Sequence, residues 1–292
     1  MKIYDCTTFH SEHMMMDVRF NALNEHIHKF IVVESLFSHS GEKKKLNFDI
    51  NNYPKFKDKI IYLVIDREPD DLINPLNENI QYKRINSIKR IELSYDFMML
   101  EIKKLSDNDL IILSDNDEIP NLDSTQFKDS NSDIYIFKQL FFYYKFNLLY
   151  DRMYWFGSKA CTKKKLKSLS WLRNLKNKKY PFWRVDTFFS KTKNSSLKII
   201  NDGGWHFTNV MSAENLYTKM TNFGHHDEFE LSELSVEDLK IKINQGLVFY
   251  DHFAGQEDKN KWEFNYKLKK ISDNLLPDSL IKDKIKLKEW FN

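Results

Sequence analysis

The sequence predicts an α/β protein built on a mostly parallel, Rossmann-type sheet flanked by helices, with an α+β second half. Three observations support this prediction. Short, continuous apolar runs at residues 30–33, 60–65 and 110–113 are typical of strands buried on both faces. Segments with helical periodicity precede the first and the third of these runs. Past residue 120, aromatic-rich runs without this regular alternation indicate a different arrangement.

The first elements are a short strand and a helix. Lys2–Cys6 is a strand candidate, and Ser11 is a suitable N-cap for the helix that follows. Apolar residues then recur at spacings of four, three and four residues, which places them on one helix face: Met16, Phe20, Leu23 and Ile27. Phe30–Val33 follows as the first buried strand.

The next elements repeat this order. Ile60–Ile65 has the same strand pattern, after a basic loop that contains proline. The strongest helix lies at residues 88–105, where apolar residues alternate spacings of three and four: Ile88, Ile91, Tyr95, Met98, Ile102 and Leu105. Leu110–Leu113 is the third buried strand. Strands that alternate with helices in this way form parallel sheets, because a helix is the usual crossover between them.

The second half is predicted to mix strands and helices. We expect strands at residues 134–138, 141–146 and 197–200, helices at 212–223 and 236–245, and an exposed helix and loop in the Lys/Asn-rich stretch 163–181. Because the chain has no internal repeat and no Pro/Gly/Ser-rich linker, residues 1–250 are predicted to form one domain with halves at 1–120 and 121–250. Residues 251–292 are expected to form a helical tail.

The composition excludes several classes of protein. The chain has 292 residues, of which 41% are hydrophobic, so it can bury a sizeable core. The net charge is only +3, far from that of a dedicated nucleic-acid-binding protein. Two cysteines cannot form a disulfide framework, which suits a reducing compartment. Neither a signal peptide nor an apolar run of the ~20 residues that a membrane helix needs is found, so we expect a cytoplasmic protein.

An acid-rich segment follows the third buried strand directly. Ser114-Asp115-Asn116-Asp117-Glu118 stands where the strand ends, and parallel sheets bind ligands at these carboxyl ends. Two carboxylates one residue apart can share a cation, or one can hold the cation and the other a ribose hydroxyl. Mg²⁺ and Mn²⁺ prefer such oxygen ligands and keep positions open for phosphate. The alternative is a solvated turn, although three acids so close together repel one another unless a cation joins them.

A second candidate segment is Gly203-Gly204-Trp205-His206-Phe207. Paired glycines allow a backbone to approach a ligand closely. His206 could complete the ligands of a metal or contact a diphosphate, and Trp205 could stack on a sugar. The alternative is a tight turn with a core tryptophan and a hydrogen-bonded histidine.

Two further segments carry candidate groups. Asp227 or Glu228 could take a proton from a hydroxyl group, or both could be solvated acids in a loop at a helix end. Glu34 directly follows a buried strand, and His39 and Gly41 lie shortly after it. Glu34 could contact a nucleotide or orient a loop, and a helix cap is the alternative.

Taken together, these segments resemble glycosyltransferase family 17 over roughly residues 1–250. The resemblance is carried, in chain order, by Met1–Phe9, Phe30–Ser35 with Ser38–Gly41, Phe56–Ile60, Leu110–Pro120, Gly204–Phe207 and His226–Phe229. The segment that contains Asp115 and Asp117 is the most specific. Each segment alone is weak, but their common order is hard to obtain by chance.

The resemblance implies a GT-A-like fold, in which residues 1–120 bind a nucleotide and residues 121–250 bind an acceptor. It implies an inverting transfer from a UDP-sugar, expected to be UDP-N-acetylglucosamine, that forms a β-linkage to a glycan. It also implies a divalent cation, expected to be Mn²⁺ with Mg²⁺ as the alternative. Asp115 and Asp117 match the family's metal and nucleotide acids, and His206, the third expected metal residue, matches the histidine of its Gly-Trp-His segment. Glu228 matches a recurrent acid, which makes it the candidate base, with its neighbour Asp227 as the second candidate.

The nucleoside is expected to bind at the loop after the first strand, with Thr7 and Thr8, and at the segment Glu34–Gly41. The family usually carries a Gln-Arg-Asn-like stretch in the helix before the acids, where this chain has Arg90-Ile91-Glu92. Either Arg90 or Glu92 replaces that stretch, or a contact to the donor has changed.

Animal members of the family carry a membrane anchor and stem, and no such segment is found here. The expected acceptor is therefore a glycan or lipid-linked glycan at the inner face of a membrane, with the basic stretch Lys163–Lys179 against anionic lipid. A nucleotidyltransferase on a similar sheet is one rival, although residues 5–12 lack the glycine-rich loop that would favour it. A binding protein without catalysis is another, which the repulsive acid cluster disfavours.

Overall fold

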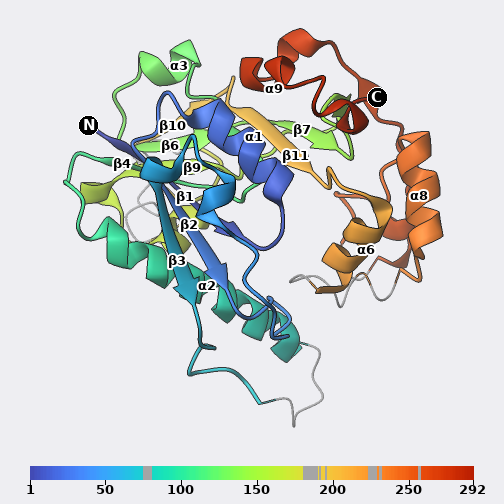
Figure 1. Ribbon diagram of the computed structural model, residues 1–292, viewed down its shortest axis with the longest axis horizontal. Helices are drawn as coiled ribbons and strands as arrows, with labels where there is room; N and C mark the ends of the chain where they lie inside the picture. The colour runs from blue at the N-terminus through green and yellow to red at the C-terminus, as the bar shows by residue number, and fades with distance from the viewer. Residues whose placement is uncertain are drawn as a thin grey trace.

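A seven-stranded, mostly parallel sheet forms the centre of the molecule (Figure 1). The computed structural model describes residues 1–74, 81–179, 190, 192–194, 196–222, 229, 232–255 and 258–292. Within these ranges, helices flank the large sheet and a second sheet of five strands packs beside it. The predicted α/β class is confirmed.

The first half supplies the predicted elements in the predicted order. They are β1 (Ile3–Phe9), α1 (His13–Leu23), β2 (Lys29–Ser35), β3 (Ile60–Ile65), α2 (Gln81–Ile102) and β4 (Leu110–Leu113), with 3₁₀ turns at Ile50–Asn52 and Lys57–Lys59. Strands β3, β2, β1 and β4 lie side by side in parallel, so their carboxyl ends share one edge of the sheet. The N-cap of α1 is Glu12 and not the expected Ser11.

Strand β9 (Lys159–Thr162) interrupts the parallel arrangement. It lies antiparallel between β4 and β6 (Ile134–Phe137), and β10 (Leu197–Ile200) pairs with the other side of β6. The strand order is β10-β6-β9-β4-β1-β2-β3. Because strands from beyond residue 120 complete this sheet, the two predicted halves of the chain share it.

The second sheet has the order β12-β8-β7-β11-β5. Its strands are β5 (Glu118–Pro120), β7 (Leu140–Tyr143), β8 (Leu148–Leu149), β11 (Gly204–Thr208) and β12 (Lys269–Lys270). Helices α6 (Ala213–Asn222) and α8 (Val236–Gln245) pack on each other beside this sheet, away from β3 (Figure 1). The short helix α3 (Thr125–Lys128) lies between β5 and β6 in the chain.

Both faces of the seven-stranded sheet are covered, as its continuous apolar strands require. On one face, Ile31 and Val33 pack with α2 and with α4 (Leu169–Arg173). On the other face, Phe30 and Val32 pack with α1, the second sheet and the C-terminal segment. The alternation of side chains along β2 lets one strand serve both layers.

The stretch 163–181, described up to residue 179, differs from the exposed helix and loop that we expected. After a 3₁₀ turn at Lys163–Lys165, its helix α4 has only five residues and buries Leu169 and Leu172 completely. Lysines dominate the composition, but these two leucines lie on one helix face and pack against α2 and the sheet. This packing carries Arg173, the last residue of α4, towards the carboxyl edge of the sheet.

The C-terminal segment folds back onto the body instead of extending as a helical tail. Residues 258–292 contain one short α-helix, α9 (Asp278–Lys282), together with β12 and 3₁₀ turns at Lys259–Glu263, Asp273–Leu275 and Lys288–Trp290. Pro277 prevents one continuous helix. Leu276, Leu280 and Leu287 are buried in the same core as α1. In the described part of the chain, no helix combines the length and the apolar character needed to cross a bilayer.

Candidate active site

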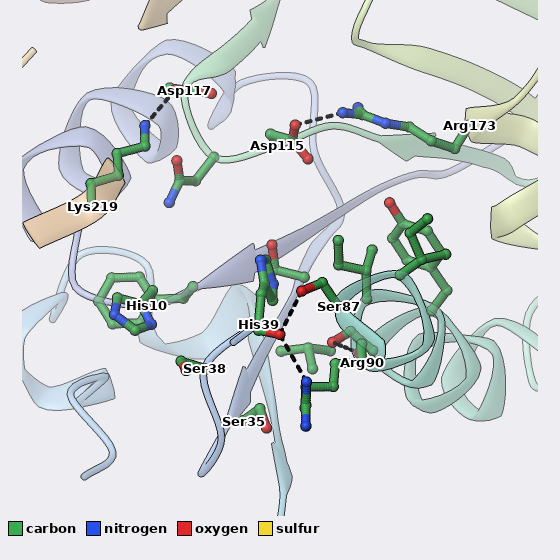
Figure 2. A pocket seen from close by; sticks show the side chains of 18 of the residues that line it. His10, Ser35, Ser38, His39, Ser87, Arg90, Asp115, Asp117, Arg173 and Lys219 are labelled. Carbon is green, nitrogen blue, oxygen red and sulfur yellow. Dashed lines mark hydrogen bonds and ion pairs between the residues drawn. The ribbon is translucent and has the colours of Figure 1, made fainter. Parts of the chain in front are cut away.

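A cavity of about 560 Å³ opens at the carboxyl edge of the seven-stranded sheet. Its walls include Thr8 near the end of β1, Ser35 at the end of β2 and Asp115 just beyond β4. Open parallel sheets bind ligands at this location. Residues from α2, α4 and α6 (Figure 2) and from β11 complete the walls. Its size falls within the roughly 300–1,000 Å³ of small-molecule sites.

The two predicted acids face different partners across this cavity. One Asp115 carboxylate oxygen lies 2.6 Å from Arg173 Nη2. The Asp117 carboxylate lies 3.5 Å from His206 Nε2 and 3.8 Å from Lys219 Nζ. Figure 2 shows the two carboxylates pointing apart, one towards Arg173 and the other towards Lys219. The positive charge that such an acid cluster requires is therefore present in side chains of the same protein.

Pairing within the second sheet brings His206 to the acids. Strand β5 begins at Glu118, directly after Asp117, and runs antiparallel to β11 so that Glu118 is paired with His206. The His206 ring is stacked on Phe141, with ring centroids 4.8 Å apart, and contacts Trp155 at 4.7 Å. These contacts orient the imidazole edge towards Asp117.

The surroundings push the pKa values of the two acids in opposite directions. Burial raises the pKa of Asp115, and the nearby Arg173 offsets this only in part. Burial would also raise the pKa of Asp117, but His206 and then Lys219 outweigh it and hold that pKa below its usual range. As the pH falls, Asp117 therefore stays ionised to a lower pH than Asp115 does. Neighbouring acids with divergent pKa values are a common property of catalytic sites.

The third acid, Glu118, is fully buried and supports the loop from within. Its carboxylate accepts hydrogen bonds from the Asp115 amide at 2.9 Å and from the Trp155 indole at 2.6 Å. Arg173 Nη1 lies 3.3 Å from the same carboxylate. A Cβ atom on Gly157 would lie only 1.8 Å from Glu118 Oε1. Position 157 has no room for a side chain, because the glutamate occupies that space.

Arg19 of α1 holds the acid loop from the protein interior. Its fully buried guanidinium forms a two-pronged ion pair with Asp5 of β1, with N–O distances of 2.8 and 2.5 Å. Arg19 Nη1 also donates to the backbone carbonyls of Asp115 at 3.1 Å and Glu118 at 2.6 Å. One arginine thus fixes both ends of the loop to β1.

Arg173 is positioned by a lysine below the end of α4. Lys159 Nζ, from β9, donates to the carbonyls of Arg173 at 2.6 Å and Leu175 at 2.7 Å. Carbonyls at a helix C-terminus lack helical partners, so a buried lysine satisfies them well. Burial and the nearby Arg173 lower the pKa of Lys159 to about 8. Asp115, against the effect of burial, raises the pKa of Arg173, which therefore stays charged.

The carboxylate of Glu34 is bonded within the loop after β2. It is fully buried and pairs with Lys44, and it accepts hydrogen bonds from the amides of Asn47 (2.8 Å) and Phe48 (2.9 Å) and from the Tyr62 hydroxyl (2.8 Å). Glu34 is not among the residues that line the cavity. Of the roles considered for it, these contacts support the orientation of a loop.

His39, Gly41 and Arg90 belong to one connected loop and helix. The His39 carbonyl accepts hydrogen bonds from Ser87 Oγ at 2.9 Å and Arg90 Nη1 at 3.0 Å (Figure 2). Burial lowers the pKa of His39, which lines the cavity, to about 4. Gly41 has a φ of +100°, a conformation that favours glycine. Arg90 also lines the cavity and pairs with Glu68 at 2.8 and 3.0 Å, so it ties α2 to this loop.

The remaining candidates lie in different surroundings. Thr7 is buried in the sheet, whereas Thr8 lines the cavity. Trp205 is not part of the cavity wall, because side chains alternate along β11 and His206 takes the inward position. The Trp205 indole donates instead to the Leu275 carbonyl at 2.6 Å. Asp227 and Glu228, the candidate bases, lie outside the residues that the structure describes.

The glycine pair approaches neighbouring strands and not a ligand. A Cβ atom on Gly203 would lie 2.3 Å from the Lys138 nitrogen. Gly204 has a φ of +109°, and its Cβ atom would lie 2.2 Å from the Ile119 carbonyl oxygen. The pair is therefore explained by close packing of backbones where β11 meets β5.

A divalent cation fits one part of the site. Within the described residues, no three side chains among His, Cys, Asp and Glu come together as a metal site. Asp117 and His206 nevertheless offer a carboxylate and an imidazole nitrogen 3.5 Å apart on the cavity wall. Cations that act on diphosphates take one or two protein carboxylates and complete their shell with phosphate oxygens and water. The wall beside Asp117 suits such a cation, whereas Asp115 is bonded to Arg173.

The comparison with protein families identifies the family of the chain. A model of glycosyltransferase family 17 matches residues 1–256, which include the acid loop, β11 and α6. The chain belongs to glycosyltransferase family 17. The resemblance inferred from the sequence motifs is confirmed, and the protein is a glycosyltransferase.

Other comparisons add little to the family assignment. No curated protein matches the chain. Among solved structures, the inositol-1-phosphate CTP transferase from T. maritima shows 12% identity and a TM-score of 0.28, over 56% of this chain and 71% of that chain. This similarity is too distant to inform the function.

Arg19, Arg173 and Lys219 are site residues that were not predicted from the sequence. Arg19 had a signal, since it lies three residues after Met16 and four before Leu23 on the predicted buried face of a helix. A charge on such a face requires an internal partner. Arg173 and Lys219 had no comparable signal, because each lies in a segment where basic residues are common.

Proposed function

We propose that this glycosyltransferase moves N-acetylglucosamine from UDP-N-acetylglucosamine to a glycan hydroxyl with inversion, forming a β-linkage. Membership of the family supports sugar transfer. One observation supports the choice of a nucleoside-diphosphate donor: Arg173 and Lys219 meet two acids at the carboxyl edge of the sheet. Preorganised cationic groups are what a departing diphosphate requires.

The nucleoside is proposed to bind between the end of β1 and the loop after β2, where Thr8, His39 and Arg90 line the cavity. The lowered pKa of His39 leaves its side chain neutral near pH 7. A neutral imidazole suits the uncharged base and ribose better than a phosphate. Asp115, on the same edge, is proposed to face the ribose or the diphosphate.

We further propose that Asp117 and His206 hold a divalent cation, Mn²⁺ or Mg²⁺, together with the donor diphosphate. A cation bound there would neutralise the negative charge of the leaving UDP. Arg173 and Lys219 contribute two further positive groups on the same side of the cavity. The low pKa of Asp117 keeps its carboxylate charged over the whole working pH range.

Inversion in a single displacement needs a base that takes the proton from the acceptor hydroxyl. Glu228 is the proposed base, and Asp227 is the second candidate. Among the described residues, Glu12 is a further carboxylate on the cavity wall. We expect replacement of the true base by its amide to lower kcat by about 10²–10⁴-fold, so Glu228→Gln, Asp227→Asn and Glu12→Gln distinguish the three.

UDP release from a panel of UDP-sugars, with Mn²⁺ and with EDTA, tests the donor and the cation. UDP-N-acetylglucosamine should be turned over fastest, and EDTA should abolish the reaction. Asp117→Ala should lower kcat by at least about 10²-fold, as the loss of one preorganised group usually does. Asp123→Ala, which removes an exposed acid beyond β5, is the matched control and should leave kcat unchanged.

Two results would count against parts of this proposal. Turnover that survives EDTA would leave Arg173, His206 and Lys219 to neutralise the diphosphate without a metal. No turnover of any UDP-sugar, combined with no binding of UDP, would refute the donor.

The proposed acceptor is a glycan or lipid-linked glycan at a membrane surface, which residues 163–179 would approach through their lysines. Lys163 and Lys164 have acidic neighbours, Asp107 at 3.0 Å and Asp133 at 3.6 Å, that reduce their free charge. Reversal of the charges at 163, 164 and 165 should weaken binding to anionic vesicles. Unchanged vesicle binding would refute this part of the proposal.

A further inference from the structure

A second cavity, of about 310 Å³, adjoins the first at Asp117. Five residues line both cavities: His10, Glu12, Asn116, Asp117 and Lys219. They come from the loop before α1, from the acid loop and from α6. A ligand in the second cavity would therefore reach Asp117, the acid that is proposed to hold the cation and, through it, the donor diphosphate.

The walls of the second cavity combine apolar and polar groups. Met15 and Val210 are buried and apolar. Asn209, Asn215 and Thr218 add amide and hydroxyl groups. A sugar ring presents C–H groups on its faces and hydroxyl groups around its edge. A mixed surface of this kind matches a sugar better than it matches a purely apolar chain.

The backbone at Asn209 shapes this cavity. Asn209 has a φ of +57°, a left-handed conformation that is uncommon outside glycine, and its side chain is buried. The turn joins β11 to α6 and directs Val210 and Met211 into the cavity wall. Asparagine adopts this conformation more readily than most other residues, so position 209 suits the turn.

Trp290 completes the cavity from the C-terminal segment, beyond the residues 1–256 that the family model matches. The Trp290 carbonyl accepts a hydrogen bond from the Phe146 amide at 2.8 Å, and Lys145 Nζ lies 5.5 Å from the centre of its ring. Asn147 and Asn292 exchange two hydrogen bonds of 2.9 and 3.1 Å. The segment is thus fixed, and an indole offers a flat apolar face at the cavity.

We propose that the second cavity is the acceptor subsite, in which one face of a sugar residue packs on Trp290 and its reacting hydroxyl points towards Asp117. This inference rests on the proposed function. The hydroxyl oxygen bonds to the anomeric carbon of the donor, and the bond from that carbon to UDP breaks. UDP leaves with the electron pair, and the hydroxyl proton passes to the base of the enzyme. Trp290 lies outside the residues 1–256 that the family model matches, so its role in acceptor binding is inferred from the cavity alone.

Binding of small glycosides tests the subsite. The probes are p-nitrophenyl α- and β-glycosides of mannose, glucose, galactose and N-acetylglucosamine. Their binding is followed by saturation-transfer NMR in the presence of UDP and diamagnetic Mg²⁺. Calorimetry measures the affinity for UDP with the same proteins. The wild type should bind at least one glycoside. Trp290→Ala should weaken that binding at least about tenfold and change the affinity for UDP less than about twofold.

Two further variants provide a control and a second test of the cavity. Phe291→Ala removes an aromatic ring from the same segment, where it packs 5.6 Å from Phe146 and away from the cavity, and should change neither affinity. Asn215→Trp fills the cavity from the exposed side of α6 and should weaken glycoside binding even if Trp290→Ala is unstable.

Several outcomes would overturn the subsite. Unchanged glycoside binding in both Trp290→Ala and Asn215→Trp would do so, and so would the absence of glycoside binding by a protein that binds UDP. A parallel loss of UDP affinity would assign the second cavity to the donor. Glycoside binding without any UDP binding by the wild type would refute the proposed donor and not the subsite.

Discussion

The active-site cavity has an acidic wall and a basic wall, and the two are constructed differently. The acidic wall is a single short loop, Asp115–Glu118, held in place by Arg19 behind it. The basic wall is assembled from α4, β11 and α6, which contribute Arg173, His206 and Lys219. Local sequence therefore sets where the acids lie, and the topology of the two sheets sets which basic side chains face them.

Removal of the support behind the acidic wall should have the largest effect. Arg19→Met leaves Asp5 as a buried and unpaired charge, which costs about 3–5 kcal/mol of the free energy of unfolding. Urea unfolding measures this loss. The control is Lys286→Met, which breaks an exposed ion pair with Asp17, a residue of α1 like Arg19. It should lower the free energy of unfolding by no more than about 1 kcal/mol. Equal losses in the two variants would show that Arg19 does not support the wall.

The basic wall is tested by Arg173→Ala. We expect kcat to fall about 10²–10³-fold, since one preorganised donor to the proposed diphosphate leaving group is lost. Arg173→Lys should restore only part of the activity, because lysine cannot present two nitrogens to Asp115 and Glu118. Steady-state kinetics with the preferred UDP-sugar measure both variants, and thermal unfolding separates inactivity from unfolding. A normal kcat in Arg173→Ala would place the diphosphate elsewhere.

A smaller effect is expected where the acidic wall meets Gly157. In Gly157→Ala, the new methyl group must displace the Glu118 carboxylate, and overpacking of this kind costs about 1–3 kcal/mol. Activity should fall as well, because the Asp115 amide loses its acceptor. Gly255→Ala is the matched control, since nothing lies within 4 Å of its Cβ position. A fully stable and active Gly157→Ala would contradict the close packing of Glu118 against Gly157.

The smallest effect concerns pH. The pKa of His39 falls from 6.5 in a free side chain to about 4 in the folded protein. Between these values the unfolded chain binds a proton that the folded protein does not, so stability is lost as the pH falls from 6.5 towards 4. His39→Gln removes this contribution, and its urea midpoint should fall less between pH 7 and pH 5. If the urea midpoint changed equally with pH in the variant and the wild type, the lowered pKa of His39 would be refuted.

The acidic wall could be predicted from the sequence because its signals are local. Strands β3 and β4 have the predicted bounds, Ile60–Ile65 and Leu110–Leu113, and the acids follow β4 directly. Once the parallel order was predicted, Asp115 and Asp117 had to lie at the carboxyl edge.

Of the basic wall, His206 was predicted as a site residue, but Arg173 and Lys219 could not be predicted, because their positions depend on contacts between distant segments. Strand β9 has the sequence Lys-Ala-Cys-Thr, which lacks the apolar run that predicts a buried strand. Its place beside β4 nevertheless brings α4 and Arg173 to the site. The orientation of β11 is set in the same way. Its pairing with β5 turns His206 inwards and therefore turns Trp205 out of the cavity.

The antiparallel strand β9 also limits the order in which the molecule can form during synthesis. Strand β4 pairs with β1 on one side and with β9 on the other, so one of its edges stays open until β9 has left the ribosome. Pairings between distant segments form late and slowly, and unpaired edges attract wrong partners meanwhile. The acid loop meets Arg173, His206 and Lys219 only after residue 219 has emerged. The cavity around the acid loop is therefore one of the last parts of the chain to assemble.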